Sequence, residues 1–241
     1  MKGFRGALIP ALVSFALWLA LTIGLAPRGG GDPTLQITSS IGWQFMLGSA
    51  VAIAAHRAIL RRDLGFDLGS KGTGWIVIFP LILCAVFGVV AAQAGFPGGR
   101  VVGLILINAA LIAVSEEVMF RGLILGAMRR QMSVAMAMIL SSILFGVSHV
   151  ANSLLTGDLK PAILQALSAM MLGQFLAILR LKTGTLWPGI LFHTLWNAGL
   201  VLMSQADAEL PLWTFALPFV AVVLLTIYAA ILWRWGKAIG P

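Results

Sequence analysis

The sequence predicts an all-α membrane protein, a polytopic helical bundle of about eight transmembrane helices. Hydrophobic residues make up 60% of the 241-residue chain and charged residues only 10%, whereas soluble domains contain about 25% charged residues. The mean hydropathy is +1.00. Apolar stretches recur at lengths near the ~20 residues that a helix needs to cross the hydrocarbon core. We therefore expect residues 1–241 to form a single integral-membrane domain.

Eight apolar segments account for the predicted spans. In chain order they are residues 7–26, 37–60, 75–95, 101–128, 133–154, 161–180, 186–203 and 212–233. Most of the loops between them contain the glycine and proline residues that end helices. Arg129 and Arg130 mark the turn after the fourth span. Trp187 and Pro188 open the seventh span, because proline is tolerated in the first turn of a helix.

The first span resembles a signal peptide, because Lys2 and Arg5 precede an apolar stretch. That stretch is longer than the usual ~7–15 residues of a signal peptide core, so we expect it to be retained as a span. Polar side chains within other spans, such as Asn108, are expected to form interhelical hydrogen bonds. Cys84 is the lone cysteine, which excludes a disulfide framework, and we expect it to be a small apolar side chain in the third span.

The basic residues predict that both termini lie in the cytoplasm. With eight spans, twelve Lys and Arg residues fall on the side of the termini, and three fall on the other side, namely Arg28, Arg100 and Lys160. Basic residues concentrate in cytoplasmic loops. This distribution accounts for the net charge of +8 in a protein that contacts the lipid bilayer, so no nucleic-acid partner is expected.

Five Glu, Arg and His residues remain inside spans once loop and span-end charges are set aside: Glu116, Glu117, Arg121, His149 and His193. An ionisable side chain inside a membrane is costly, which makes it a candidate for function. Glu117 and Arg121 are four residues apart, so we expect them to form an ion pair on one helix face. Glu116 diverges from Glu117 by about 100° around the helix and has no such partner, so it is the candidate general base.

The sequence around each of the two histidines indicates a different role. His193 and Asn197 are four residues apart, which places an imidazole and an amide on one helix face as a donor pair for a developing oxyanion. His149 taken singly fits a structural hydrogen bond as well as a catalytic role. Gly146 precedes it, and a small residue there would let another helix approach closely.

Three motifs occur in order along the chain. Glu116 to Arg121 reads EExxxR, Phe145 to His149 reads FxxxH, and His193 to Asn197 reads HxxxN. Together they resemble the CPBP family, which unites CAAX prenyl proteases with bacteriocin-processing and self-immunity proteins. The motifs lie within residues 116–197, inside a motif-bearing core of about 101–203.

The resemblance implies an intramembrane endopeptidase that hydrolyses a peptide bond of a membrane-associated protein or peptide. Glu116 would activate water, His149 would position it, and His193 with Asn197 would stabilise the oxyanion. Three further motif residues would support the site structurally: Glu117, Arg121 and Phe145. We expect such a compact chain in a prokaryotic inner membrane. The sequence determines neither the substrate nor the oligomeric state.

The residues leave metal dependence open. Glu116, His149 and His193 match a three-ligand zinc site with a fourth position for water. Such a site would leave Glu117 as the remaining base, and Glu117 is already matched to Arg121. This favours water activation by Glu116 without a cofactor, and Zn²⁺ stays the alternative.

Two other functions stay open, a proton-coupled transporter that uses the intramembrane Glu and His and a non-catalytic immunity or scaffold protein.

A site shared by Glu116 and His149 requires the two residues to lie at a similar depth in the membrane. Counted from the turn at Arg129 and Arg130 at ~1.5 Å per residue, Glu116 lies about 20 Å along its helix and His149 about 28 Å along the next. Tilt or offset of the helices must bring the two residues level.

Overall fold

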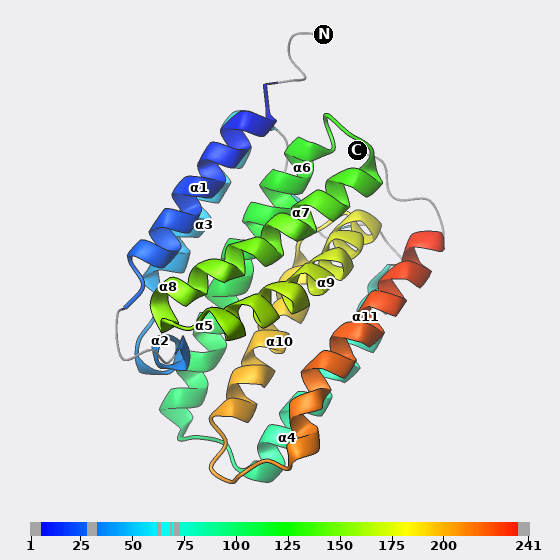
Figure 1. The fold of residues 1–241 in the computed structure, drawn as a ribbon. Coiled ribbons are helices and arrows are strands. Elements are labelled where there is room, and N and C mark those ends of the chain that lie inside the picture. Colours follow the sequence, from blue (N-terminus) through cyan, green and yellow to red (C-terminus); the bar gives the residue numbers. More distant parts are fainter. Residues whose placement is uncertain (1–5, 28–32, 62–63, 68, 70–72, 236–241) are drawn as a thin grey trace.

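The computed structural model of the chain confirms the all-α fold class. It describes residues 6–27, 33–61, 64–67, 69 and 73–235. These ranges contain helices and turns and no strand. The long helices lie side by side in one bundle (Figure 1). Six basic residues used in the charge prediction lie outside the described residues: Lys2, Arg5, Arg28, Arg62, Lys71 and Lys237.

The helices follow the predicted spans in order. Those that correspond to the eight spans are α1 (Leu8–Gly24), α3 (Trp43–Ile59), α4 (Ile78–Ala94), α5 with η2 and α6 (Gly99–Glu117, Val118–Ile124 and Leu125–Met128), α7 with η3 and α8 (Val134–Ser148, His149–Asn152 and Ser153–Thr156), α9 (Leu159–Thr183), α10 (Trp187–Ser204) and α11 (Leu217–Arg234). Three shorter helices are α2 (Pro33–Ser39), η1 (Gly74–Val77) and η4 (Leu212–Ala216).

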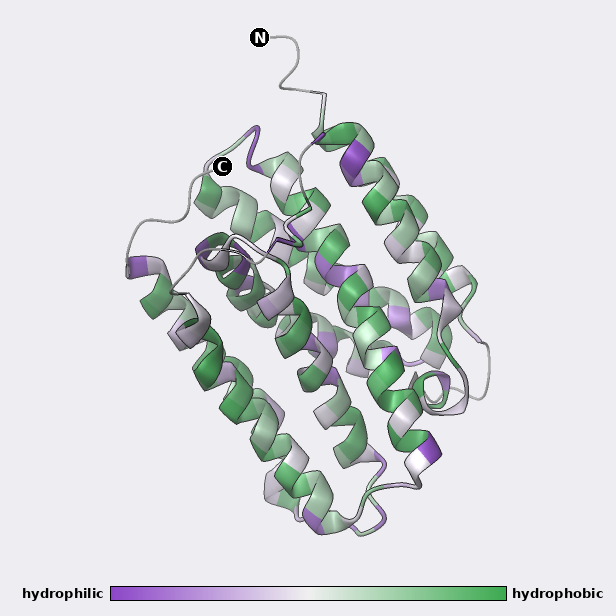
Figure 2. Cartoon of the chain, turned by 180° about the vertical axis from the view of Figure 1, so that it is seen from behind, coloured by the Kyte–Doolittle hydropathy of each residue, from purple (hydrophilic) through white to green (hydrophobic). Residues whose placement is uncertain are grey.

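Five helical segments within the described ranges are long and apolar enough to cross a membrane, which makes the chain an integral membrane protein. They are Gly74–Ala94, Gly99–Met128, Val134–Thr156, Leu159–Thr183 and Leu212–Arg234. Apolar residues predominate along their lengths (Figure 2). Helix α1 is apolar but shorter, and neither α3 nor α10 is among the five. The count of eight spans therefore stays a prediction.

The predicted second span, residues 37–60, is wrong at its start. Helix α2 ends at Ser39 and α3 begins only at Trp43. The side chain of Asn108 on α5 satisfies the backbone at this break. Its Oδ1 accepts a hydrogen bond from the Gly42 N–H at 2.7 Å, and its Nδ2 donates to the carbonyl oxygens of Ile37 and Ser40, each at 2.8 Å. Buried backbone groups need such partners. Asn108 therefore forms the predicted interhelical hydrogen bonds, and they satisfy the backbone where α2 has ended and α3 has not yet begun.

The fourth predicted span is one continuous helical segment that contains a π-helical stretch. This stretch, η2, begins at Val118, directly after Glu117, and all seven of its residues are buried. Short π-helical stretches inside α-helices occur often at functional sites. The change of helical period therefore lies immediately beside the two glutamates.

Helices α7 and α9 cross at close range, as the small residue Gly146 predicts. A Cβ atom on Gly146 would lie 2.5 Å from the carbonyl oxygen of Ala166 on α9. A Cβ atom on Gly173 of α9 would lie 3.2 Å from the Phe145 ring. The two glycines thus let the helix backbones approach, and this contact places the end of α7, with His149, against α9.

Candidate active site

Glu117 is the centre of a buried polar cluster at the end of α5. Its Oε1 atom lies 3.1 Å from Nη1 of Arg121 and 3.0 Å from Nδ1 of His193. The side chains of Glu117 and Arg121 are 1% and 2% exposed. The spacing of Glu117 and Arg121 predicts this ion pair, but it does not predict the contact with His193, which lies on another helix.

Arg121 is held by the second motif as well as by Glu117. Its guanidinium carbon lies 4.2 Å from the centroid of the Phe145 ring, a cation–π arrangement. Its Nη2 donates to the carbonyl oxygen of Gly173 on α9 at 3.5 Å. A buried charge needs such partners. Phe145 therefore connects α7 to the glutamate cluster on α5.

His193 lies between the two glutamates. Its Nδ1 donates to Glu117, because a carboxylate that is paired with Arg121 accepts hydrogen bonds and does not donate them. Its Nε2 faces Oε2 of Glu116 at 3.5 Å. Neighbouring residues on a helix diverge, yet both glutamates reach the same imidazole from opposite ring nitrogens. The sequence analysis did not anticipate this arrangement.

Among the described residues, Glu116 has a buried carboxylate oxygen without a hydrogen-bond partner. Its side chain is 13% exposed, and its Oε2 is buried and makes no hydrogen bond with the described residues. Nearly all buried polar atoms in folded proteins are hydrogen-bonded. A carboxylate oxygen that is buried, unsatisfied and next to a cavity is suited to accept a proton.

Gly189 allows α10 to approach Glu117. A Cβ atom on this glycine would lie 3.0 Å from Oε2 of Glu117, so a larger residue would push the carboxylate away. Gly189 precedes His193 by one helical turn in α10. The sequence analysis did not single it out as a site residue, although it directly follows Trp187 and Pro188, which open the seventh predicted span.

His149 begins η3, at the end of α7. Its Nδ1 donates to the carbonyl oxygen of Phe145 at 2.8 Å, which leaves Nε2 as an acceptor. Its ring packs edge to face on Phe145, with 4.8 Å between the centroids. The backbone bond and the ring contact together fix the orientation of the imidazole.

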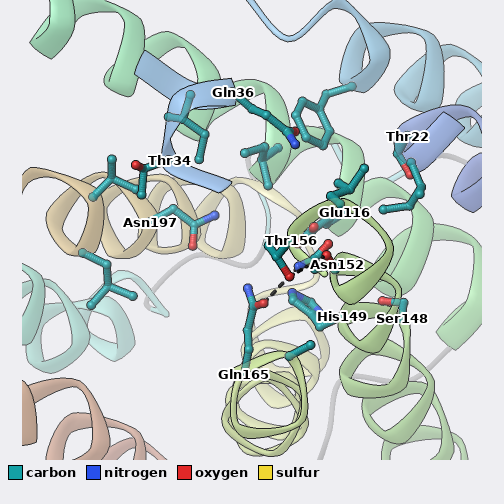
Figure 3. Close-up of a pocket in the computed structure, with 18 of the residues that line it drawn as sticks. Thr22, Thr34, Gln36, Glu116, Ser148, His149, Asn152, Thr156, Gln165 and Asn197 are labelled. Atoms are coloured by element: carbon teal, nitrogen blue, oxygen red, sulfur yellow. Dashed lines mark hydrogen bonds between the residues drawn. The ribbon is translucent and has the colours of Figure 1, made fainter. Parts of the chain in front are cut away.

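A cavity of about 420 Å³ brings the predicted residues together. Glu116 from α5, His149 from η3, and His193 and Asn197 from α10 all line it. Figure 3 shows Glu116, His149 and Asn197 around this cavity. The helix packing therefore brings Glu116 and His149 to the same cavity, although they lie at different distances along the chain from the turn between their helices.

The sequence analysis missed several polar and aromatic residues that also line the cavity: Trp18, Ser148, Asn152 and Thr156. Gln165 also lines it, and its Oε1 accepts a hydrogen bond from Nδ2 of Asn152 at 2.9 Å. Asn152 and Thr156 follow His149 by three and seven residues, which is the spacing of one helix face. That spacing could have identified Asn152 and Thr156 as neighbours of His149 from the sequence.

The zinc alternative concerns Glu116, His149 and His193. Within the described parts of the chain, no three His, Cys, Asp or Glu side chains are grouped so that they could hold a metal ion. Both ring nitrogens of His193 face carboxylates at 3.0 and 3.5 Å. Since no such group of three ligands is found among the described side chains, the proposed mechanism uses side chains only, and metal dependence stays a prediction.

Comparison with known proteins agrees with the resemblance seen in the motifs. Residues 98–199 match the model of a family described as type II CAAX prenyl endopeptidase Rce1-like. The matched segment contains all three motifs and is consistent with the CPBP family. No curated protein and no solved structure matches the chain.

Proposed function

We propose, from the match of residues 98–199 to a CAAX endopeptidase family, that the chain is an intramembrane endopeptidase in which Glu116 activates water. The match supports a CAAX-type intramembrane protease. The observation that carries the mechanism is the Glu116 carboxylate. It borders the cavity, faces His193, and has an oxygen without a hydrogen bond among the described residues.

In the first step, Glu116 takes a proton from a water molecule in the cavity. The water oxygen attacks the carbonyl carbon of the scissile peptide bond, and the carbonyl oxygen becomes an oxyanion. His149 orients the water, because its Nε2 is an acceptor while Nδ1 is held by Phe145. Positioned proton transfer of this kind contributes about 10²–10⁴-fold to a rate.

His193 and Asn197 stabilise the oxyanion. In this role the imidazole carries protons on both nitrogens, one bound to Glu117 and one on Nε2 directed at the oxyanion. Asn197 lines the same cavity from one helical turn further along α10 and supplies an amide N–H. Fixed donors of this kind are effective because they need no reorganisation during the reaction.

Glu117 and Arg121 act as positioning residues. The guanidinium keeps the Glu117 carboxylate in place, and the carboxylate fixes the imidazole of His193. A buried carboxylate that orients a histidine is a common supporting device in active sites. In the last step the oxyanion re-forms the carbonyl, the C–N bond breaks, and Glu116 returns its proton to the leaving amine, so the products are a carboxylate and a free amino terminus.

The test is cleavage of a quenched fluorescent peptide panel by the purified protein in proteoliposomes. Glu116→Gln is expected to lower kcat by about 10²–10⁴-fold, since the general base is removed, and His149→Ala is expected to lower it less. Glu209→Gln is the matched control, because Glu209 is exposed outside the cavity.

Full cleavage by both site variants would contradict the mechanism. Proton-coupled solute flux without cleavage would favour a transporter instead. Binding of a partner without either activity would favour a scaffold or immunity protein.

A further inference from the structure

The cavity opens at one end of the bundle. His193 and Trp18, deep in its lining, are each 3% exposed. Pro161, Gln165 and Ser204 also line it and are exposed. These three residues belong to the start of α9 and the end of α10. The lining thus becomes more exposed toward the end of the bundle where α9 begins and α10 ends, and we call this the mouth end.

Protein fills the path to the opposite end. The buried stretch η2, Val118–Ile124, begins directly after Glu117. Beyond it, the segment after α3 closes the bundle. Arg130 donates to the carbonyl oxygen of Leu60 and Arg180 donates to that of Leu64, and both leucines are buried. We call this the closed end.

Basic residues distinguish the two ends. Seven Lys and Arg residues of the described chain lie at the closed end: Arg57, Arg61, Arg129, Arg130, Arg180, Lys182 and Arg234. Two, Arg100 and Lys160, lie at the mouth end. Short loops rich in Lys and Arg remain in the cytoplasm. We infer that the cavity takes its substrate from the outer side of the membrane, so that the peptide cut by this protein is a segment presented on the outer face.

The chemistry of the cavity indicates what kind of segment fits. Apart from Glu116, His149 and His193, the residues described in its lining are apolar, amide-bearing or hydroxyl-bearing, and none is Lys or Arg. The described lining offers no Lys or Arg to pair with a free carboxylate, whereas its amide and hydroxyl groups can hydrogen-bond the backbone of a peptide. The lining therefore suits an uncharged internal segment of a polypeptide better than a chain that ends beside the scissile bond. This inference takes the reaction from the proposed function, on which it rests, and takes the route of entry from the packing of the helices.

The side of entry can be measured without any activity. Cys84 is buried, and Cys84→Ser provides a background without cysteine. In this background, Ser204→Cys and Gln165→Cys each place a thiol at the mouth end, and Gln131→Cys places one in the exposed turn before α7 at the closed end. Spheroplasts that express each variant are treated with a membrane-impermeant maleimide, before and after permeabilisation.

We expect loss of the free thiol at the two mouth positions in intact spheroplasts, and at Gln131→Cys only after permeabilisation. The opposite pattern would overturn the inference. Two mouth positions keep the test decisive if one variant folds poorly. Failure of the proposed function would appear separately, as absence of cleavage in wild-type protein, because labelling does not depend on catalysis.

A peptide pair tests the substrate class. One peptide carries a free C-terminal carboxylate close to the cleaved bond, and the other is identical but amidated. We expect the two to be cut at similar rates by wild-type proteoliposomes. A preference for the free carboxylate of about tenfold or more, which is about 1.4 kcal/mol, would overturn the assignment to internal segments.

Discussion

Replacing Arg121 with methionine tests whether the buried ion pair supports the site as the packing indicates. Methionine keeps most of the side-chain volume but removes the positive charge. Glu117 would then stay buried at 1% exposure without its guanidinium at 3.1 Å. Removal of one partner of a buried ion pair typically costs about 3–5 kcal/mol, because the other charge is left without compensation. The cation–π interaction with the Phe145 ring, now at 4.2 Å, would also be lost.

The measurement is the free energy of unfolding of the purified protein in mixed micelles, with peptide cleavage measured in parallel. Arg121→Met should lower the unfolding free energy by about 3–5 kcal/mol. The exposed Arg100 provides the matched control, and Arg100→Met should change it by no more than about 0.5 kcal/mol. A change below about 1 kcal/mol for Arg121→Met would refute the reasoning, since such a value is typical of an exposed pair.

The double variant Glu117→Gln with Arg121→Met separates stability from catalysis. It removes both charges together, and replacement of a whole buried pair by neutral groups is often close to neutral in stability. We expect it to regain most of the lost unfolding free energy. Cleavage should stay low, because His193 would lack the carboxylate at 3.0 Å that orients its ring. Recovery of both properties would show that Glu117 has no positioning role.

Three further predictions concern the same cavity. Gly189→Ala should lower kcat, because its Cβ atom would lie 3.0 Å from the Glu117 carboxylate. Gly103→Ala is the control and should leave kcat unchanged, because a Cβ atom there would meet nothing within 4 Å. Equal kinetics for the two variants would contradict the close approach of α10 to Glu117. Asn197→Ala should lower kcat by about 10²–10³-fold with little change in KM, as expected for a donor that acts on the oxyanion, and steady-state kinetics check the split. Cleavage should persist after dialysis against a chelator, and loss of activity that Zn²⁺ restores would favour a metal mechanism instead.

Much of the fold follows from local properties of the chain. A hydrophobic stretch of about 20 residues must satisfy its backbone within itself in a bilayer, so hydropathy and length locate the helices. The pairing of Glu117 with Arg121 is equally local, since residues four apart meet on any helix. The break between α2 and α3 was missed, because the groups that satisfy it come from Asn108, far away in sequence.

The sequence by itself identified the candidate residues for the chemistry, namely the ionisable side chains that an apolar chain would otherwise exclude. The tertiary structure decided how they meet. Whether His193 contacts Glu116, Glu117 or both depends on how closely α10 approaches α5, and Gly189 permits a close approach because it has no side chain that would meet Glu117. The level of His149 likewise depends on the close crossing of α7 and α9. Such contacts arise from the packing of helices distant in sequence, and no local periodicity encodes them.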